Sequence, residues 1–427
     1  MMKRITLLRP VYILGTAMCI SLFLFTVAIM YTSGIIPFMD FIIKDTTKLH
    51  MVHNSTPVPL PENTSSLDES LRYIPHSTIQ KWKERDYLIV LGIPSLDIDE
   101  RRTARKMQRT TCWQFPGVAR RANNFTGAML VLYVLARQPF LSYRYSESLL
   151  KEVAEYHDII TLSMNEGVPS PFLSYRYSES LLKEVAEYHD IITLSMNEGV
   201  PSANRTVGSN KSWGMDVSVA LCRKVFYWFE IALRVFPNTN YIAKGDDDMF
   251  LLVPQYLADL YILPQRRLYW GFLGKDIIKN GSEWSWYRRA WGPLYTLAKD
   301  VAIHLVSHMP LRRLINIPYE KDREAEFLSL NMENEDTMVG RVLYESLKFA
   351  GYKENVFFVS EGPCTFRDIG SHSRPFNLSF TFVMLHHLWE ADYIELMNLF
   401  GNITKARPRR RRRIHGRLHG RLHLGCR

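Results

Sequence analysis

The sequence contains no Cys-x-x-Cys pair and no spacing of cysteine and histidine that is typical of zinc ligands, so we do not expect a zinc site. Only five cysteines occur in 427 residues. Cys19 lies in an apolar run and Cys426 near the C-terminal end, which leaves Cys112, Cys222 and Cys364 in the body of the protein. At most one disulfide can join two of these three, and the sequence leaves the pair open.

Acidic residues are absent from the last 21 positions, where nine arginines lie. Without these nine charges the net charge of +10 falls to +1. The body of the protein is therefore nearly neutral, and we expect no nucleic-acid partner. The tail, residues 404–427, contains HGRL twice in succession and is predicted to be disordered, with polyanion binding as the alternative.

Charged residues are also absent from residues 11–30, a run of twenty residues that is long enough to cross a bilayer. Because three basic residues precede the run, the pattern predicts a cytosolic segment over residues 1–10 and an uncleaved anchor over 11–30. A cleaved signal peptide is the alternative, but its apolar core is usually only about 7–15 residues long. Residues 31–84 are rich in Ser, Thr, Pro and Asn over much of their length, and we interpret them as a stem.

Potential glycosylation sites follow the apolar run. Eight Asn-x-Ser/Thr sequons lie on this side of the anchor, at Asn54, Asn63, Asn124, Asn204, Asn210, Asn280, Asn377 and Asn402. Although chance would supply a few of them, eight agree with an oxidising, glycosylating lumen.

Apolar runs that are typical of buried strands alternate with helical patterns over residues 85–403. Residues 87–92 and 128–136 are expected strands, and residues 101–109 form a basic helical stretch between them. Alternation of this kind predicts an α/β fold with a central, mostly parallel sheet whose ligands lie at the carboxyl ends of the strands. The arginines after the first strand are then placed to bind a phosphate, or they form a solvated helix face.

An apolar strand, residues 241–245, ends in three consecutive carboxylates, Asp246, Asp247 and Asp248. Adjacent anions repel one another unless a cation or solvent screens them, and hard divalent cations prefer carboxylate oxygens. An acidic turn between strands is the alternative. The aromatic-rich helical pattern over residues 219–236 leads directly into this strand, so we interpret the three aspartates as a metal and diphosphate site at a strand's carboxyl end.

Two further groups of titratable residues lie toward the C-terminus. Glu335 and Asp336 begin a helical pattern, where helix capping alone would explain them. His386 and His387 end an apolar run, where a histidine packed in the core is the alternative to a ligand.

Residues 139–170 and 171–202 are identical over 32 positions. Two identical copies do not form a solenoid, which needs at least about three repeats. A recent duplication and a sequence-assembly fault both explain the pattern. We predict that one copy fills a single position in the sheet while the other bulges out or packs badly. Paired strands from both copies would contradict this prediction.

The order of the motifs resembles the β1,3-type glycosyltransferases of the GT-A fold, a family 31-like group, and it is closest to the trypanosomatid enzymes that use UDP-galactose or UDP-N-acetylglucosamine. The motifs that carry the resemblance are RTTCW at 109–113, EYHDIITL, GDDDMFL, YWG at 269–271, EDTMVG and FVMLHHL. The resemblance covers roughly residues 85 to 403. It implies a GT-A nucleotide-sugar fold on a single-pass type II anchor in the Golgi membrane, with the catalytic domain in the lumen.

The resemblance also implies roles for particular residues. Asp248 and His386 would bind Mn²⁺ or Mg²⁺, with His387 as the second choice of histidine, and Asp246 would lie near the ribose or the metal's waters. Arg105 and Arg109 would contact the nucleotide. Asp336 would be the base that deprotonates a hydroxyl of the glycan acceptor.

The implied reaction is inverting transfer of galactose or N-acetylglucosamine from a UDP-sugar to a glycan, an N-glycan or a GPI side chain, in β linkage. The sequence departs from the family pattern at Thr337, at residues 291–295 and in the duplicated block. A membrane-anchored glycan-binding relative that the duplication has inactivated is therefore the alternative. A hydrolase with two carboxylates is a third possibility, but it would not need a diphosphate metal site.

Overall fold

In the computed structural model, all the residues that can be described lie within the unit Asn63–Arg427. The described residues are 70–71, 74–96, 98–137, 147–156, 159–162, 192–199, 213–280, 283–349, 356–370, 378, 381–407, 411–414 and 421–424. The expected cytosolic segment, the expected membrane anchor and most of the expected stem lie outside them. Among the residues described, no helix is long and apolar enough to span a membrane.

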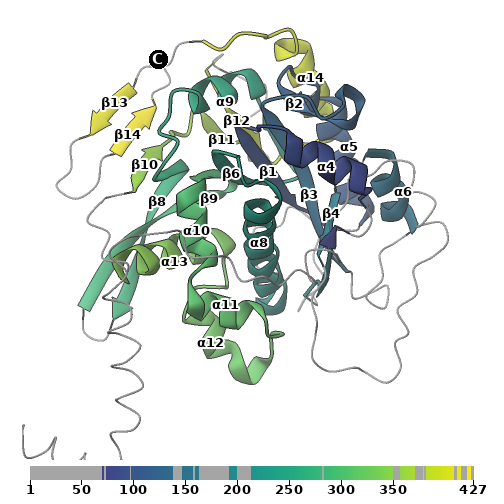
Figure 1. Cartoon of the computed structure of the whole chain (residues 1–427). Coiled ribbons are helices and arrows are strands. Elements are labelled where there is room, and N and C mark those ends of the chain that lie inside the picture. Colours follow the sequence, from purple (N-terminus) through teal and green to yellow (C-terminus); the bar gives the residue numbers. More distant parts are fainter. Residues whose placement is uncertain are drawn as a thin grey trace, which may run out of the picture. The chain divides into compact units, whose positions relative to one another are not determined.

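A mixed, mostly parallel sheet forms the centre of the unit (Figure 1). Its central strands β1 (Ile89–Pro94), β3 (Met129–Arg137) and β6 (Tyr241–Gly245) are parallel and almost fully buried, and they agree with the strands expected from the apolar runs. On the other side of β6 the sheet becomes antiparallel through two long strands, β9 (Glu283–Ala298) and β8 (Leu268–Asn280). β10 (Phe357–Ser360) then pairs with β8 in parallel.

Helices cover both faces of this sheet. The aromatic-rich helix α8 (Met215–Val235) packs on β1, β3 and β6, and it also contacts α10 (Lys299–Val306) and α13 (Glu335–Phe349). Gly92 of β1 lies under α8, because a Cβ atom there would come within 2.1 Å of the Trp228 ring. Leu132 pairs with Gly92, so the next residue, Tyr133, points to the opposite face, where its hydroxyl meets the helix α5 (Asp99–Thr110).

Three short strands form a second sheet. β7 (Met249–Leu251) pairs antiparallel with β12 (Met384–His386), and β11 (Phe366–Asp368) pairs with β12 in parallel. The helix α14 (Glu390–Phe400) follows β12 and packs against α5. This small sheet joins the segment after the three aspartates to the C-terminal part of the chain.

The folded unit begins earlier than residue 85, where the sequence analysis placed its start. The helix α4 (His76–Glu84) falls in the expected stem, yet its Trp82 is fully buried. The Trp82 ring contacts Phe125 and Phe236, with 5.9 Å between ring centroids in each pair. The last part of the expected stem is therefore packed against the body, because burial of one tryptophan outweighs a polar local composition.

The prediction about the duplicated block is wrong, because both copies provide paired strands of the central sheet. The first copy forms α6 (Glu147–Tyr156) and β4 (Ile159–Leu162), and the second forms β5 (Ile192–Asn197). Equivalent residues of the two strands lie opposite one another, as Thr161 does with Thr193. The two identical strands therefore pair in parallel and in register.

The two copies share one position beside β3. Tyr133 pairs with Ile159 of the first copy, and the next residue, Val134, pairs with Ile192 of the second. Ile192 is the equivalent of Ile160, so the register continues unchanged from one copy to the other. A single copy therefore has all the residues that this position requires.

Deletion of residues 171–202 is expected to leave the unit folded. β4 would then occupy the whole position beside β3, and shortening the connection by 32 residues would change the free energy of unfolding by no more than about 1 kcal/mol. Denaturant unfolding of the two proteins checks this expectation. A deleted protein that fails to fold would show that the second copy is required.

The C-terminal tail contains two strands, whereas the sequence predicts disorder over residues 404–427. β13 (Arg411–Ile414) and β14 (Arg421–Leu424) form an antiparallel pair, and β14 pairs in parallel with β10. Charged residues are common on edge strands because they discourage further pairing. A run of arginine is thus compatible with the edge of a sheet, which composition alone does not reveal.

The cysteines of the body do not pair with one another. Cys112 and Cys222 are buried and free. Cys364 is in a disulfide, but its partner is neither of these two cysteines. Cys112 and Cys222 therefore act as small apolar side chains in the core.

Candidate functional site

The three aspartates lie where the strand order of the sheet changes direction. β1 has the next strand of the chain, β3, on one side and β6 on the other, and ligands of α/β sheets bind at the carboxyl ends of such strands. Ser95 follows β1 and donates a hydrogen bond from its Oγ to Asp247 Oδ2, at 2.5 Å. The carboxyl ends of β1 and β6 are thus joined at the aspartates.

Strand pairing in the small sheet brings a histidine to the aspartates. His386 of β12 lies opposite Met249 of β7, one residue after Asp248. The Nε2 atom of His386 is 3.0 Å from Asp248 Oδ1 and 3.5 Å from Asp246 Oδ2. Asp248, His386 and His387 each offer a ligand atom, and these three atoms lie within 4.8 Å of one another.

The charges in this group support one another in the folded protein. Burial by itself raises the pKa of Asp248, but hydrogen bonds and charge from His386 and Arg101 hold that pKa well below its usual value. Burial also opposes the positive charge on His386, yet the contacts of its Nε2 atom with Asp246 and Asp248, together with the nearby carboxylate of Asp368, raise the pKa of His386 well above its usual value. The group therefore combines ionised carboxylates with a counter-charge, which a divalent cation could supply equally well.

Asp247 points away from the histidine. Its carboxylate is buried and accepts hydrogen bonds from Ser95 and from Arg101 Nη1, the latter at 2.6 Å. Burial raises the pKa of Asp247, and the charge of Arg101 opposes that shift. Asp247 thus anchors the turn to the body, while Asp246 and Asp248 face His386.

Arg101 and Gln108 of α5 were not among the site residues expected from the sequence. Arg101 also donates to Asp248 Oδ2 at 3.1 Å. Gln108 Nε2 donates to the backbone oxygens of Asp246 and Met249, at 3.0 and 2.9 Å, and so holds the two ends of the acidic turn. A signal for Arg101 was present, because it lies four residues before Arg105 on the same side of a helix.

Asp368 is a further residue that the sequence did not indicate. It lies opposite His386 in the β11–β12 pair, and its Oδ1 is 2.7 Å from His387 Nδ1. The nearby His386 ring and the hydrogen bond to His387 lower the pKa of Asp368 to about 2. A carboxylate beside a histidine fixes the orientation of the ring, which is the usual role of a group behind a metal ligand.

Lys244 connects the aspartates to the second acidic group. Its Nζ lies 2.5 Å from Asp246 Oδ1 and 3.4 Å from Glu335 Oε2, and it donates to the Gly292 backbone oxygen at 2.7 Å. Glu335 also accepts a hydrogen bond from the Tyr295 hydroxyl. The residues that depart from the family pattern, 291–295, are therefore in direct contact with the candidate site.

Asp336, the expected base, lies at the start of α13 beside Glu335. Arg289 of β9 donates to its Oδ2 at 2.5 Å, and the backbone nitrogen of Thr337 donates to its Oδ1 at 2.7 Å. The side chain of Asp336 is 17% exposed, whereas that of Glu335 is only 3% exposed. Of the two carboxylates, Asp336 is thus the one that a substrate can reach.

The structure places Arg105 and Arg109 in the interior of the protein and not at the surface of the acidic site. Both are buried, and both form ion pairs with Glu152 of α6, at 2.6 Å for Arg109. Arg105 also donates to Ser95 Oγ at 2.5 Å. Arg101, which contacts Asp247 and Asp248, is therefore better placed than Arg105 and Arg109 for the expected contact with a nucleotide.

Substitution of Glu335 by glutamine is expected to change how stability depends on pH. Burial raises the pKa of Glu335 from its usual 4.5 to about 7, although Lys244 opposes the shift. Between these two values the unfolded chain loses the proton first, so rising pH favours unfolding, and the loss is complete above about pH 7. A shift of this size corresponds to about 3 kcal/mol.

Glu335→Gln should remove this component, so the variant should gain stability relative to the wild type as the pH rises from about 4.5 to about 7. Urea unfolding at several pH values measures the difference, with exposed Glu395→Gln as the control. Parallel stability curves for the wild type and Glu335→Gln would show that folding does not raise the pKa of Glu335.

Comparison with known proteins gave no match to any family model, and no curated protein matches the chain. The function is therefore inferred from the residues of the site.

Proposed function

We propose that the chain is a metal-dependent inverting glycosyltransferase of the GT-A type, which transfers galactose or N-acetylglucosamine from a UDP-sugar to a hydroxyl of a glycan. The observation that carries the proposal is the meeting of Asp248 and His386, 3.0 Å apart, at the carboxyl end of a parallel strand. A carboxylate pair with a histidine at a switch point of an α/β sheet suits a metal-bound diphosphate.

The residues of the site fit a hard divalent cation such as Mn²⁺ or Mg²⁺. Asp248 and His386 would hold the cation, and Asp246, whose Oδ2 is 3.5 Å from His386 Nε2, would bind a water of the cation or the ribose. The Nδ1 atom of His386 is buried and makes no hydrogen bond, and its nearest carboxylate oxygen, on Asp368, is 3.8 Å away. The bound cation would neutralise the negative charge that develops on the β-phosphate as the sugar leaves.

Protein groups around the aspartates would bind the rest of the diphosphate. Arg101 lies in the first turn of α5, where backbone N–H groups and the helix dipole favour anions. Its guanidinium is already 3.1 Å from Asp248 Oδ2. Arg101 would therefore contact a phosphate oxygen beside the cation.

Asp336 would accept the proton of the acceptor hydroxyl as that oxygen attacks the anomeric carbon. Arg289 fixes the position of the Asp336 carboxylate, and the buried Glu335 holds Lys244 behind it. A single displacement inverts the α linkage of the donor to a β linkage.

Two indications from the sequence are part of the proposal and concern its setting. The apolar run over residues 11–30 and the sequons support the proposal of a catalytic unit in the Golgi lumen on a type II anchor. Two sequon residues in the described chain, Asn124 and Asn402, are exposed, as glycosylation requires.

The direct test is release of UDP by the purified protein, measured with a panel of UDP-sugars and a set of glycan acceptors, with and without Mn²⁺. We expect release from UDP-galactose or UDP-N-acetylglucosamine that needs both the cation and an acceptor. Absence of turnover with every donor would favour the inactive glycan-binding relative. Cleavage of the acceptor glycan without a nucleotide sugar would favour the hydrolase.

A further inference from the structure

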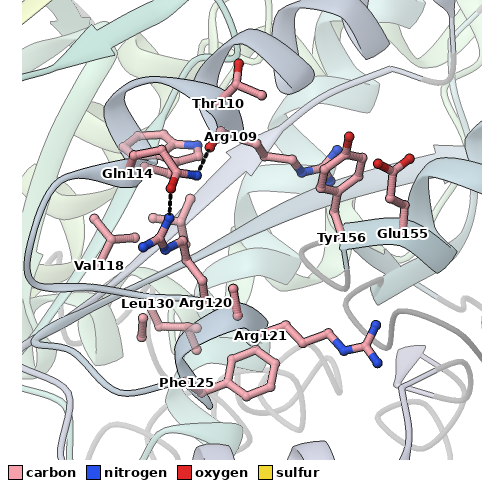
Figure 2. Close-up of a pocket in the computed structure, with 14 residues that line it drawn as sticks. Arg109, Thr110, Gln114, Val118, Arg120, Arg121, Phe125, Leu130, Glu155 and Tyr156 are labelled. Carbon is pink, nitrogen blue, oxygen red and sulfur yellow. Dashed lines mark hydrogen bonds between the residues drawn. The ribbon is translucent and has the colours of Figure 1, made fainter. Parts of the chain in front are cut away.

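A pocket of about 440 Å³ lies away from the acidic site, between the ends of α5 and α6 and the short strand β2 (Val118–Ala119). Figure 2 shows Arg109 reaching toward Tyr156 on one side of it and Arg120 bonded to Gln114 on the other. None of Asp246, Asp248 and His386 lines the pocket. Pockets that hold small molecules are usually about 300–1,000 Å³ in volume, so its size suits a compact ligand.

The walls of the pocket are apolar and partly aromatic. Trp113, Phe125, Leu130 and Val131 line it and are buried, and Tyr156 closes one side. Trp113 is held in place because its Nε1 donates to the Tyr133 hydroxyl at 2.9 Å. A flat apolar group would find fixed rings on which to pack.

Positive charge is concentrated in the same walls. Three arginines, Arg109, Arg120 and Arg121, line the pocket, and the only carboxylate in its lining is that of the exposed Glu155. Of the three, Arg109 also pairs with Glu152, which lies outside the lining. The Nε atom of Arg120 is buried and has no hydrogen-bond partner, and burial lowers the pKa of Arg120. Among the described residues Arg120 pairs with no carboxylate, so an anion in the pocket would satisfy it.

We propose that this pocket binds a small anion with a flat apolar body, such as an aromatic phosphate, sulfonate or carboxylate. The rings and aliphatic side chains would bury the apolar body, and Arg120 would form a charge-assisted hydrogen bond with the anionic group. Arg109, stacked on Tyr133 and Tyr156 at 4.8 and 4.1 Å from the ring centroids, would extend the positive wall. The inference does not depend on the proposed glycosyltransferase activity, because the two sites share no residue.

The test is calorimetric titration of the purified full-length protein with 1-naphthyl phosphate, 1-naphthalenemethanol and inorganic phosphate. We expect 1-naphthyl phosphate to bind at least about tenfold more tightly than either of the others, because only it has both the ring and the charge. Equal affinity for 1-naphthyl phosphate and 1-naphthalenemethanol would overturn the role of the arginines. The same titration in saturating UDP and Mn²⁺ should give unchanged affinity, whereas competition would place the ligand in the acidic site.

Variants locate the binding. Arg120→Gln should weaken 1-naphthyl phosphate at least about tenfold, since a hydrogen bond to a charged group is lost. Arg266→Gln is the matched control, because the Arg266 side chain is 86% exposed and lies outside the pocket lining. If Arg120→Gln does not fold, Ala122→Phe is the second test, because it adds volume at an exposed residue of the pocket rim and should also weaken binding of 1-naphthyl phosphate. Unchanged affinity in the folded variants would overturn the proposal.

Discussion

Replacement of Asp248 by alanine is expected to lower Mn²⁺-dependent release of UDP at least about a hundredfold, equivalent to about 2.7 kcal/mol of transition-state stabilisation. Asp248 carries the most strongly stabilised negative charge of the three aspartates, since both His386 and Arg101 lie within 3.1 Å of it. Removing this carboxylate takes away a ligand that the cation needs while charge develops on the leaving diphosphate. The assay compares rates of UDP release at saturating donor.

The matched control is Asp322→Ala, which removes an exposed aspartate far along the chain from the site. Binding of Mn²⁺ should be weakened in Asp248→Ala and unchanged in the control. Folding should survive in both, because Asp247 retains its bonds to Ser95 and Arg101 when Asp248 is shortened. Equal rates for the wild type and Asp248→Ala would rule out the proposed metal role of this residue.

Replacement of Glu152 by alanine is expected to lower the free energy of unfolding by about 3–5 kcal/mol, the usual cost of removing one partner of a buried ion pair. The Glu152 carboxylate is 3% exposed and pairs with Arg102, Arg105 and Arg109. Without the Glu152 carboxylate, the guanidinium groups of these three arginines would lose the negative charge that they share. Denaturant unfolding measures the loss.

The duplication provides a control of identical local sequence. Glu184 is the equivalent of Glu152 in the second copy and lies outside the described residues. The arginine cluster is already paired with Glu152, so Glu184→Ala should change the free energy of unfolding by no more than about 0.5 kcal/mol. If instead each single variant is stable and only the double variant loses stability, the two copies exchange at the cluster, and the assignment to Glu152 alone is wrong.

The local elements of the body could be predicted from the sequence because each depends on its own residues. Apolar runs indicated β1, β3 and β6, and the aromatic helical stripe indicated α8, which is buried as expected. Their alternation predicted a mostly parallel sheet flanked by helices, and the structure has one. The placement of three aspartates at the end of a buried strand followed from the same pattern.

Other features depend on contacts between distant segments, and for these features the local composition led to wrong predictions. The polar stem pattern hid Trp82, which is buried by Phe125 and Phe236. The arginine-rich tail suggested disorder, yet two of its segments form strands at an edge that β10 offers. One copy of the duplicated block was expected to bulge out or pack badly, but both copies pair with β3.

By itself, the sequence determined the fold class, the buried strands and the position of the acidic turn, because periodicity and local charge are properties of neighbouring residues. Only the tertiary structure decided which residues meet there. Pairing of β7 with β12 sets His386 beside Asp248, the crossing of α5 places Arg101 on the aspartates, and α6 turns Arg105 and Arg109 toward Glu152. Strand register and helix packing are fixed by burial across the whole sheet, and no short stretch of sequence contains that information.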